Sequence, residues 1–324
     1  MKTKKIGLVG IYFPGAYDAL HENVPEGFEL VDALSPEAYG NLADCEYLIS
    51  RLDIDPDIIN HTPNVKFWQR WGAGFDHVDL KAWGERGIPI ATCPGVNSGI
   101  VAELAIMLML AGYRNLLQIN RQLRAGHWPR TEYFGRSFMI KGKTVGVLGL
   151  GHIGKKVAAL ASAFGANVIY YDIVRQPEQE EQFGYRFVDF DTLLKESDIF
   201  TIHCPLNEET RGMIGAAQFA QMKPTAMLIN TARGPIVDEA ALVDALTTGK
   251  IATAGLDTYE HEPLPKDHPL LTLDNVVASA HAGGNTKDND INMVNYVYHN
   301  IVAFDRGEPL NTPGDIVNGE YLKK

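Results

Sequence analysis

Short apolar runs alternate with helix-like stretches along most of the chain. In the first hundred residues the apolar runs are Ile6–Tyr12, Tyr47–Ser50, Val65–Trp68 and Ile88–Ala91. A second series begins at Thr144, with expected strands near 144–149, 167–171, 198–202, 226–230, 252–257 and 276–280 and expected helices near 153–164, 238–248 and 287–304. Because the later runs are continuously apolar, they predict parallel strands covered on both faces. The pattern therefore predicts an α/β protein with doubly wound parallel sheets.

One long helix is predicted between the two series, from Ser98 to about Leu123. Val101, Leu104 and Leu108 recur at helical spacing, and apolar residues occupy most sides of the helix. Such a helix must be covered on most sides. We therefore expect it to lie between two domains or against a second copy of the chain.

Composition narrows the classes of protein. The 324 residues are enough for about two domains, and 29 Lys+Arg against 40 Asp+Glu give a net charge of −11, which gives no general attraction to nucleic acid or anionic lipid. Cys45, Cys93 and Cys204 lie far apart and in no zinc-ligand spacing, as expected for a cytoplasmic protein without a metal site. The longest apolar run, Ile100–Gly112, is shorter than the roughly 20 residues a bilayer span needs. We expect a soluble protein with no nucleic-acid or membrane partner.

A glycine-rich turn follows the strand expected at 144–149. Gly149, Gly151 and Gly154 form G-x-G-x-x-G between a strand and a helix, the setting in which this pattern binds a dinucleotide pyrophosphate. Asp172 ends the next strand, where a carboxylate accepts hydrogen bonds from the ribose hydroxyls and repels the 2′-phosphate of NADP. NAD is therefore the expected cofactor, although Arg175 could soften that repulsion. A turn that serves packing alone is the alternative.

Three polar clusters lie at the ends of later strands, at Asn230–Pro235, Asp257–Pro263 and His281–Gly284. Doubly wound sheets bind their ligands at such ends. Each cluster alone is ambiguous, because arginines near turns are usually surface residues and histidines at strand ends usually serve packing. Together they supply a guanidinium for a carboxylate, a titratable imidazole and carboxylates beside it. That set is what reversible reduction of a 2-oxo acid requires.

With these motifs, the chain resembles the D-isomer-specific 2-hydroxyacid dehydrogenase family over essentially its whole length. The matching segments are Arg70–Asp76, Val101–Glu103, Gly149–Gly154, His203–Leu206, Asn230–Asp238, Leu256–Pro263 and His281–Thr286. The resemblance implies two Rossmann-like domains, with an NAD-binding domain at 100–298 inserted into a substrate-binding domain at 1–99 and 299–324. It also implies a homodimer.

The resemblance assigns roles to individual residues. Arg233 would bind the substrate carboxylate, His281 would be the acid/base, and Glu262 would be the partner of its imidazole. The implied cofactor-binding residues are Gly149, Gly151, His152, Ile153, Gly154, Asp172, His203, Cys204, Pro205, Thr210, Thr231, Ala232, Asp257, His281 and Gly283. His203 is thus assigned to the cofactor loop rather than to catalysis, and Asp257 is expected to face the nicotinamide.

The substrate side is less specific. The implied substrate-binding residues are Arg51, Arg70, Trp71, Gly72, Ala73, Gly74 and Arg233, with a minor chance that His77 touches substrate. Arg51 and Arg70 stand where some phosphoglycerate dehydrogenases carry phosphate-binding arginines, although both could equally be structural ion-pair partners, and Trp71 occupies a position where those enzymes commonly have a small residue. The substrate stays open among glyoxylate or hydroxypyruvate, 3-phosphohydroxypyruvate, pyruvate and bulkier 2-oxo acids.

Two other functions remain as alternatives. A non-enzymatic, NAD-binding corepressor-like sensor can retain Arg233, Glu262 and His281, and a phosphite dehydrogenase uses a similar triad. The length of the chain, without recruitment tails, favours the enzyme.

Overall fold

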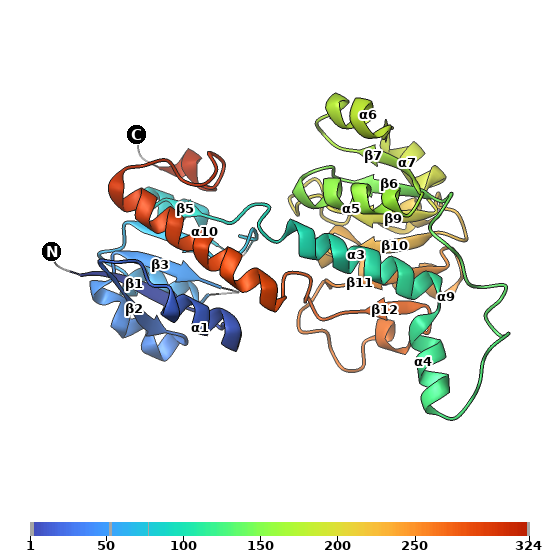
Figure 1. The fold of residues 1–324 in the computed structure, drawn as a ribbon, viewed down its shortest axis with the longest axis horizontal. Coiled ribbons are helices and arrows are strands. Elements are labelled where there is room, and N and C mark those ends of the chain that lie inside the picture. The colour runs from blue at the N-terminus through green and yellow to red at the C-terminus, as the bar shows by residue number, and fades with distance from the viewer. Residues whose placement is uncertain (1–2, 52–53, 77, 323–324) are drawn as a thin grey trace. The chain divides into compact units, whose positions relative to one another are not determined.

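The computed structural model describes residues 3–51, 54–76 and 78–322, so His77 lies outside the described residues. The chain forms two compact units (Figure 1). Unit 1 runs up to Asn97 and resumes at Asn285, and unit 2 is Ser98–Gly284. The expected boundary between residues 298 and 299 falls inside a long helix, α10 (Lys287–Arg306). The boundary lies before that helix because its buried face packs on the sheet of unit 1.

Unit 1 is built on a parallel sheet with the strand order β2-β1-β3-β4-β5. Its strands are β1 (Lys4–Val9), β2 (Phe28–Ala33), β3 (Tyr47–Ser50), β4 (Phe67–Arg70) and β5 (Ile90–Ala91). One face packs against α1 (Pro14–Glu22) and α10. The other packs against α2 (Leu80–Glu85) and the 3₁₀ helices η1 (Pro36–Asp44) and η2 (Pro56–His61). A further 3₁₀ helix, η5 (Gly319–Tyr321), follows α10.

Unit 2 holds a seven-stranded parallel sheet with the order β12-β11-β10-β9-β6-β7-β8. The strands are β6 (Thr144–Leu148), β7 (Asn167–Tyr171), β8 (Arg186–Phe187), β9 (Ile199–Ile202), β10 (Met227–Asn230), β11 (Thr253–Leu256) and β12 (Val276–Ala278). The order reverses between β6 and β9, and ligands of doubly wound sheets bind at the carboxyl ends beside such a switch point. Both predicted parallel sheets are thus present.

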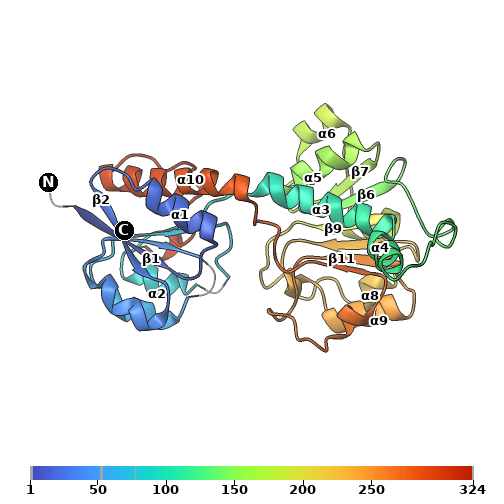
Figure 2. The same ribbon diagram turned by 60° about the horizontal axis from the view of Figure 1, so that its bottom comes forward.

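Helices cover both faces of the unit 2 sheet. The helices of unit 2 are α3 (Ser98–Tyr113), α4 (Leu116–Arg124), α5 (His152–Ala163), α6 (Pro177–Phe183), α7 (Phe190–Glu196), α8 (Ala216–Phe219) and α9 (Glu239–Thr247), with 3₁₀ helices η3 (Gly234–Ile236) and η4 (Pro269–Thr272). Figure 2 shows α3 and α5 on one face and α8 and α9 on the other. Two separate apolar clusters fill the space between the sheet and these layers.

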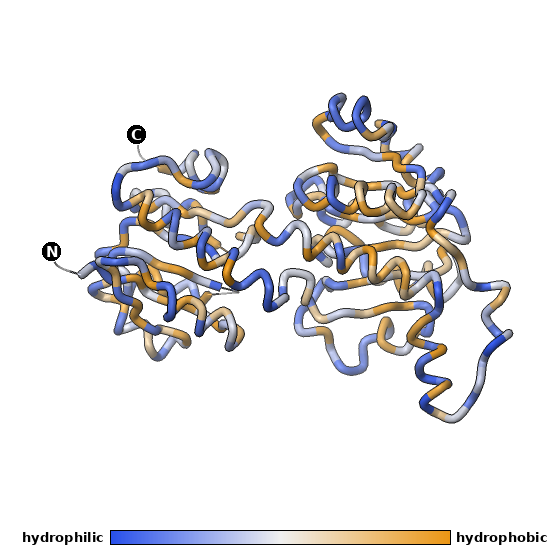
Figure 3. The backbone as a smooth tube through the Cα atoms, in the orientation of Figure 1, coloured by the Kyte–Doolittle hydropathy of each residue, from blue (hydrophilic) through white to orange (hydrophobic). Residues whose placement is uncertain are grey.

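The helix predicted from Ser98 to Leu123 is broken in the structure. α3 and α4 are bent by 63° at their junction, where Asn115 has a left-handed backbone with φ of 49°. The Asn115 side chain donates hydrogen bonds to the Arg136 carbonyl and the Ser137 hydroxyl, and asparagine tolerates this conformation better than most residues. Figure 3 shows the largely apolar α3 followed by the mixed polar and apolar α4. Among the described residues, no single helix is long and apolar enough to cross a bilayer.

Candidate active site

The glycine turn after β6 leaves open space at its centre. Gly149 has φ of +90°, and a Cβ there would lie 2.7 Å from the Cys204 amide nitrogen. A Cβ at Gly154 would overlap the Gly149 carbonyl, so this glycine lets α5 pack closely on the turn. A Cβ at Gly151 would meet nothing within 4 Å. A ligand can therefore approach the backbone at Gly151, beside the start of α5, and the start of a helix favours an anionic group.

Asp172 ties the end of β7 to the glycine turn. Its Oδ2 accepts a hydrogen bond from the Leu150 amide at 2.6 Å, and its Oδ1 accepts one from the Val174 amide at 3.1 Å. The carboxylate is half-buried. It is thereby fixed beside the turn, where sequence reasoning expects the ribose.

The turn after β9 contains His203, which is partly buried, with its Nδ1 shielded from solvent. Its Nε2 lies 2.7 Å from the Thr201 hydroxyl, and burial lowers the pKa of His203 to about 3. The ring is therefore neutral at physiological pH. Further along this segment, the Thr210 hydroxyl donates to the Pro205 carbonyl at 2.7 Å and closes the loop.

Two buried polar atoms near the glycine turn fit a polar ligand. Thr231 Oγ1 and His203 Nδ1 have no hydrogen-bond partner among the described residues. Thr231 follows β10 and His203 follows β9, and these strands are neighbours in the sheet. Buried polar groups without partners are costly, and a bound polar molecule satisfies them. Together with the space at Gly151, they fit a dinucleotide lying across the strand ends.

The turn after β10 presents Arg233. Asn230 Oδ1 accepts a hydrogen bond from the Ala232 amide at 3.0 Å, and its Nδ2 donates to the Arg233 carbonyl at 3.0 Å. The Arg233 guanidinium donates to the Ala232 carbonyl at 2.8 Å. A Cβ at Gly234 would overlap the Tyr259 carbonyl, so this turn touches the turn after β11.

Asp257 fixes the turn that carries His281. Its Oδ1 accepts from the Ala282 amide and its Oδ2 from the Gly283 amide, both at 2.9 Å, and its own carbonyl accepts from the His281 amide at 2.8 Å. His281 has a left-handed backbone with φ of 50°. Sequence reasoning predicted only a nicotinamide contact for Asp257 and missed this bracing role. The available signal was a buried Asp at a strand end, a residue that commonly bonds backbone amides.

His281 and Glu262 form a close pair. His281 Nδ1 lies 2.6 Å from Glu262 Oε2, and Glu262 Oε1 accepts from the Tyr259 amide at 3.0 Å. Partial burial alone would raise the pKa of Glu262, but the hydrogen bonds from His281 and Tyr259, with the nearby charges of His281 and Arg233, lower it overall. The His281 side chain is 49% exposed. The three residues predicted to be catalytic thus gather within unit 2.

The expected substrate loop lies in unit 1. Arg51 and Arg70 are only 7% and 8% exposed. Arg51 donates to the Ile11 carbonyl at 2.8 Å and stacks on Phe13 at 4.0 Å. Arg70 donates to the Ser50 hydroxyl at 3.3 Å and to the Gly74 carbonyl at 3.4 Å. Both guanidinium groups therefore support the protein's own loops.

The other residues of the expected substrate loop, Trp71 to Gly74, are partly buried or exposed. The Trp71 ring packs edge-on against Tyr12, with centroids 5.8 Å apart. Gly72 has φ of +119°, and Ala73 is exposed. The loop thus offers backbone groups more than side chains.

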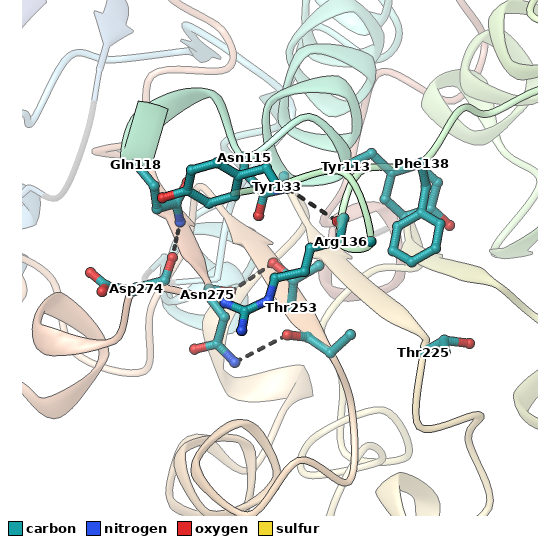
Figure 4. Close-up of a pocket in the computed structure, with 13 residues that line it drawn as sticks. Tyr113, Asn115, Gln118, Tyr133, Arg136, Phe138, Thr225, Thr253, Asp274 and Asn275 are labelled. Atoms are coloured by element: carbon teal, nitrogen blue, oxygen red, sulfur yellow. Dashed lines mark hydrogen bonds between the residues drawn. The ribbon is translucent and has the colours of Figure 1, made fainter. Parts of the chain in front are cut away.

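A cavity of about 420 Å³ lies elsewhere in unit 2 (Figure 4). It is lined by Arg136, Tyr133 and Gln118 on one side and by Thr253 and Asn275 on the other. Thr253 and Asn275 stand at the amino ends of β11 and β12. This is the opposite sheet edge from His281, so the cavity is not the candidate active site.

Known proteins resemble this chain over most of its length. Residues 106–283 match the model of the D-isomer specific 2-hydroxyacid dehydrogenase, NAD binding domain. The D-3-phosphoglycerate dehydrogenase of Archaeoglobus fulgidus is 42% identical over 261 residues, which are 81% of this chain and 49% of the relative, so the chain spans about half the length of that protein. The glyoxylate reductase of Korarchaeum cryptofilum is 39% identical over 284 residues, 86% of this chain and 85% of that protein.

A solved structure agrees in fold over the whole chain. The NADPH-dependent glyoxylate/hydroxypyruvate reductase of Sinorhizobium meliloti, in complex with NADP and malonate, has a TM-score of 0.84 and 28% identity and covers 100% of this chain and 99% of its own. The matched domain family binds NAD, and NAD is the cofactor of this protein. A non-enzymatic sensor is not favoured, since these relatives carry the names of enzymes. The chain therefore belongs to the D-isomer-specific 2-hydroxyacid dehydrogenase family and is an NAD-dependent enzyme.

Proposed function

We propose that the protein reduces small, unphosphorylated 2-oxo acids of the glyoxylate and hydroxypyruvate class with NADH, and that the reaction is reversible. The observation that carries this proposal is the 2.6 Å pair of His281 and Glu262 close to Arg233. A guanidinium, an imidazole and its carboxylate partner are the groups that a 2-oxo acid needs for binding and protonation.

Arg233 binds the substrate in this proposal. Its planar guanidinium holds the carboxylate through two parallel hydrogen bonds and places the neighbouring carbonyl beside His281. Asn230 shapes the turn that presents Arg233, through its bonds to Ala232 and Arg233. The carbonyl carbon is thereby oriented before any bond changes.

His281 moves the proton. Because Nδ1 is held by Glu262, exchange with the substrate falls to Nε2, which donates a proton to the carbonyl oxygen in reduction and takes it back in oxidation. The Glu262 carboxylate holds the imidazole in place through this contact and fixes the orientation of the ring. The bound nicotinamide supplies the hydride that reduction adds to C2.

The absence of a phosphate on the substrate is inferred from unit 1. Arg51 and Arg70 are nearly buried and already donate to protein carbonyl and hydroxyl oxygens. These bonds leave fewer N–H donors of each guanidinium for a phosphate. Curated relatives carry the names of both glyoxylate reductases and phosphoglycerate dehydrogenases, so relatedness alone does not decide.

NADH consumption with a panel of 2-oxo acids tests the proposal. Glyoxylate and hydroxypyruvate are expected to give the highest kcat/KM, above pyruvate and 3-phosphohydroxypyruvate. A preference for the phosphorylated acid would overturn the substrate class. No turnover with any 2-oxo acid, despite NADH binding, would overturn the proposed reaction itself.

We further propose a homodimer. α4 and the segment after it expose Leu116, Trp128, Phe134 and Met139, with Trp128 78% exposed. Figure 1 shows this segment extending away from the sheet of unit 2. Exposed apolar side chains in such number mark a protein interface. Light scattering on the purified protein is expected to give twice the 35.7 kDa chain mass, and a monomeric mass would contradict the proposal.

A further inference from the structure

Arg175 is the one guanidinium in the loop Asp172–Gln176 that follows β7. Its Nε donates to Glu180 Oε1 at 2.8 Å and its Nη2 donates to Glu180 Oε2 at 2.7 Å. The guanidinium also lies over the Phe187 ring at 5.6 Å. Two parallel hydrogen bonds and a ring contact hold this side chain in one orientation.

Glu180 is itself held in place. The hydroxyl of the buried Tyr170 donates to Glu180 Oε1 at 2.8 Å and accepts from the Gln176 amide at 2.8 Å. The hydrogen bond from Arg175 is the largest cause that lowers the pKa of Glu180, to about 2. The carboxylate is therefore ionised throughout the physiological range. Tyr170 lies in β7, so this chain of contacts anchors the Arg175–Glu180 pair to the sheet.

The loop that holds Arg175 begins at Asp172, the residue expected to meet the adenosine ribose. NADP differs from NAD by a phosphate at the ribose 2′ position. Asp172 repels that phosphate, whereas an arginine three residues further on would attract it and bind its oxygens. The S. meliloti relative is NADPH-dependent, so the fold of this family does not by itself exclude NADP.

We propose that Glu180 is a positioning residue for cofactor choice, and that it keeps the enzyme selective for NAD by holding Arg175 in a bidentate pair. An ordinary exposed ion pair would contribute little, because both side chains move freely in solvent. Here the carboxylate is only 18% exposed and also binds Tyr170, so releasing Arg175 requires breaking several contacts at once. The inference extends the assignment of NAD as cofactor and does not depend on which 2-oxo acid is reduced.

The test measures dissociation constants of NADH and NADPH by protein fluorescence or calorimetry on the full-length protein. E180A is expected to tighten NADPH binding about tenfold relative to NADH, the effect of one charge-assisted contact, while Asp172 still opposes a complete switch. R175A is expected to keep the wild-type ratio, because the arginine is already held by Glu180. The double variant R175A/E180A is expected to lose the tighter NADPH binding of E180A.

A matched control separates this effect from a change in net charge. E196A breaks an ion pair of unit 2 in which both side chains are exposed, with Arg186, and also removes one negative charge. It is expected to leave the NADPH-to-NADH ratio unchanged. If E180A does not fold, E180Q keeps the shape of the side chain and weakens only the ion pair, with a smaller gain expected in the same direction.

Several results would overturn the inference. An unchanged ratio in E180A or E180Q would show that Glu180 has only a structural role. If the tighter NADPH binding persists in R175A/E180A, or if E196A reproduces it, the effect comes from net charge alone. Weaker NADPH binding in R175A would show that Arg175 already binds the phosphate. None of these binding results affects the proposed 2-oxo acid reduction, which is read from turnover.

Discussion

Two histidines follow strands in the sheet of unit 2, and their surroundings differ. His203, after β9, is partly buried beside the Thr201 hydroxyl, and burial lowers its pKa to about 3. His281, after β12, is half exposed and lies 2.6 Å from the Glu262 carboxylate. Both look alike in the sequence as polar residues at strand ends. The comparison teaches that the groups facing an imidazole, rather than its place at a strand end, decide whether it can transfer protons.

Removing His281 is expected to give the largest effect. H281A is expected to lower kcat for glyoxylate reduction by about 10²–10⁴-fold, because the positioned proton donor is lost. H203Q, in contrast, is expected to alter NADH affinity but not the pH dependence of turnover, because His203 stays neutral over the assay range. Steady-state kinetics between pH 5 and pH 9 check both variants. The comparison fails if H281A keeps wild-type turnover.

Removing Arg233 tests whether substrate and cofactor are bound by different residues. R233A is expected to raise KM for glyoxylate by about 100-fold, through loss of two charge-assisted hydrogen bonds, with little change in the dissociation constant of NADH. R233K is the matched control, since it keeps the charge but loses the planar fork. Equal losses of glyoxylate and NADH binding in R233A would contradict its role as carboxylate binder.

Neutralising Glu262 is expected to give the smallest of these effects, visible mainly in kcat. E262Q keeps the shape of the side chain but removes the charge from the hydrogen bond to His281 Nδ1, so kcat for glyoxylate reduction is expected to fall about tenfold. In the wild type, the pKa of Glu262 is lowered on folding, so its contribution to stability is complete above the unfolded pKa and is lost as the pH falls through the folded pKa. An unchanged kcat in E262Q would contradict the role of Glu262 as the partner of His281.

Most strands could be predicted from sequence because buried parallel strands read as continuous apolar runs. β3 was expected and found at Tyr47–Ser50, and β7 at Asn167–Tyr171. β2 (Phe28–Ala33) was not predicted, because its sequence mixes Glu29 and Asp32 with apolar residues. The two-residue strand β8 is too short to give a pattern.

The bend at Asn115 could not be predicted from helical periodicity, which continues on both sides of it. It depends on hydrogen bonds to Arg136 and Ser137, which lie 21 and 22 residues further along the chain, beyond α4. The second domain boundary was misplaced for a similar reason. The apolar face of α10 packs on β1 and β3, and this assigns the helix to unit 1, which its own sequence pattern does not reveal.

The candidate site was predictable in its chemistry but not in its supporting contacts. The pairing of His281 with Glu262 was expected and is present. The bonds from Asp257 to Ala282 and Gly283, and those from Asn230 to its own turn, were not expected. Such contacts join side chains to backbone groups, whose positions no sequence pattern records.

Transfer of a labelled hydride tests the central claim most directly. The enzyme is incubated with glyoxylate and NADH carrying deuterium on the transferred position of nicotinamide C4, and the product is analysed by mass spectrometry. With the wild-type enzyme, the account predicts glycolate that carries the deuterium at C2. With H281A, it predicts almost no labelled glycolate. Glycolate without the label, or equal labelled product from H281A, would contradict it.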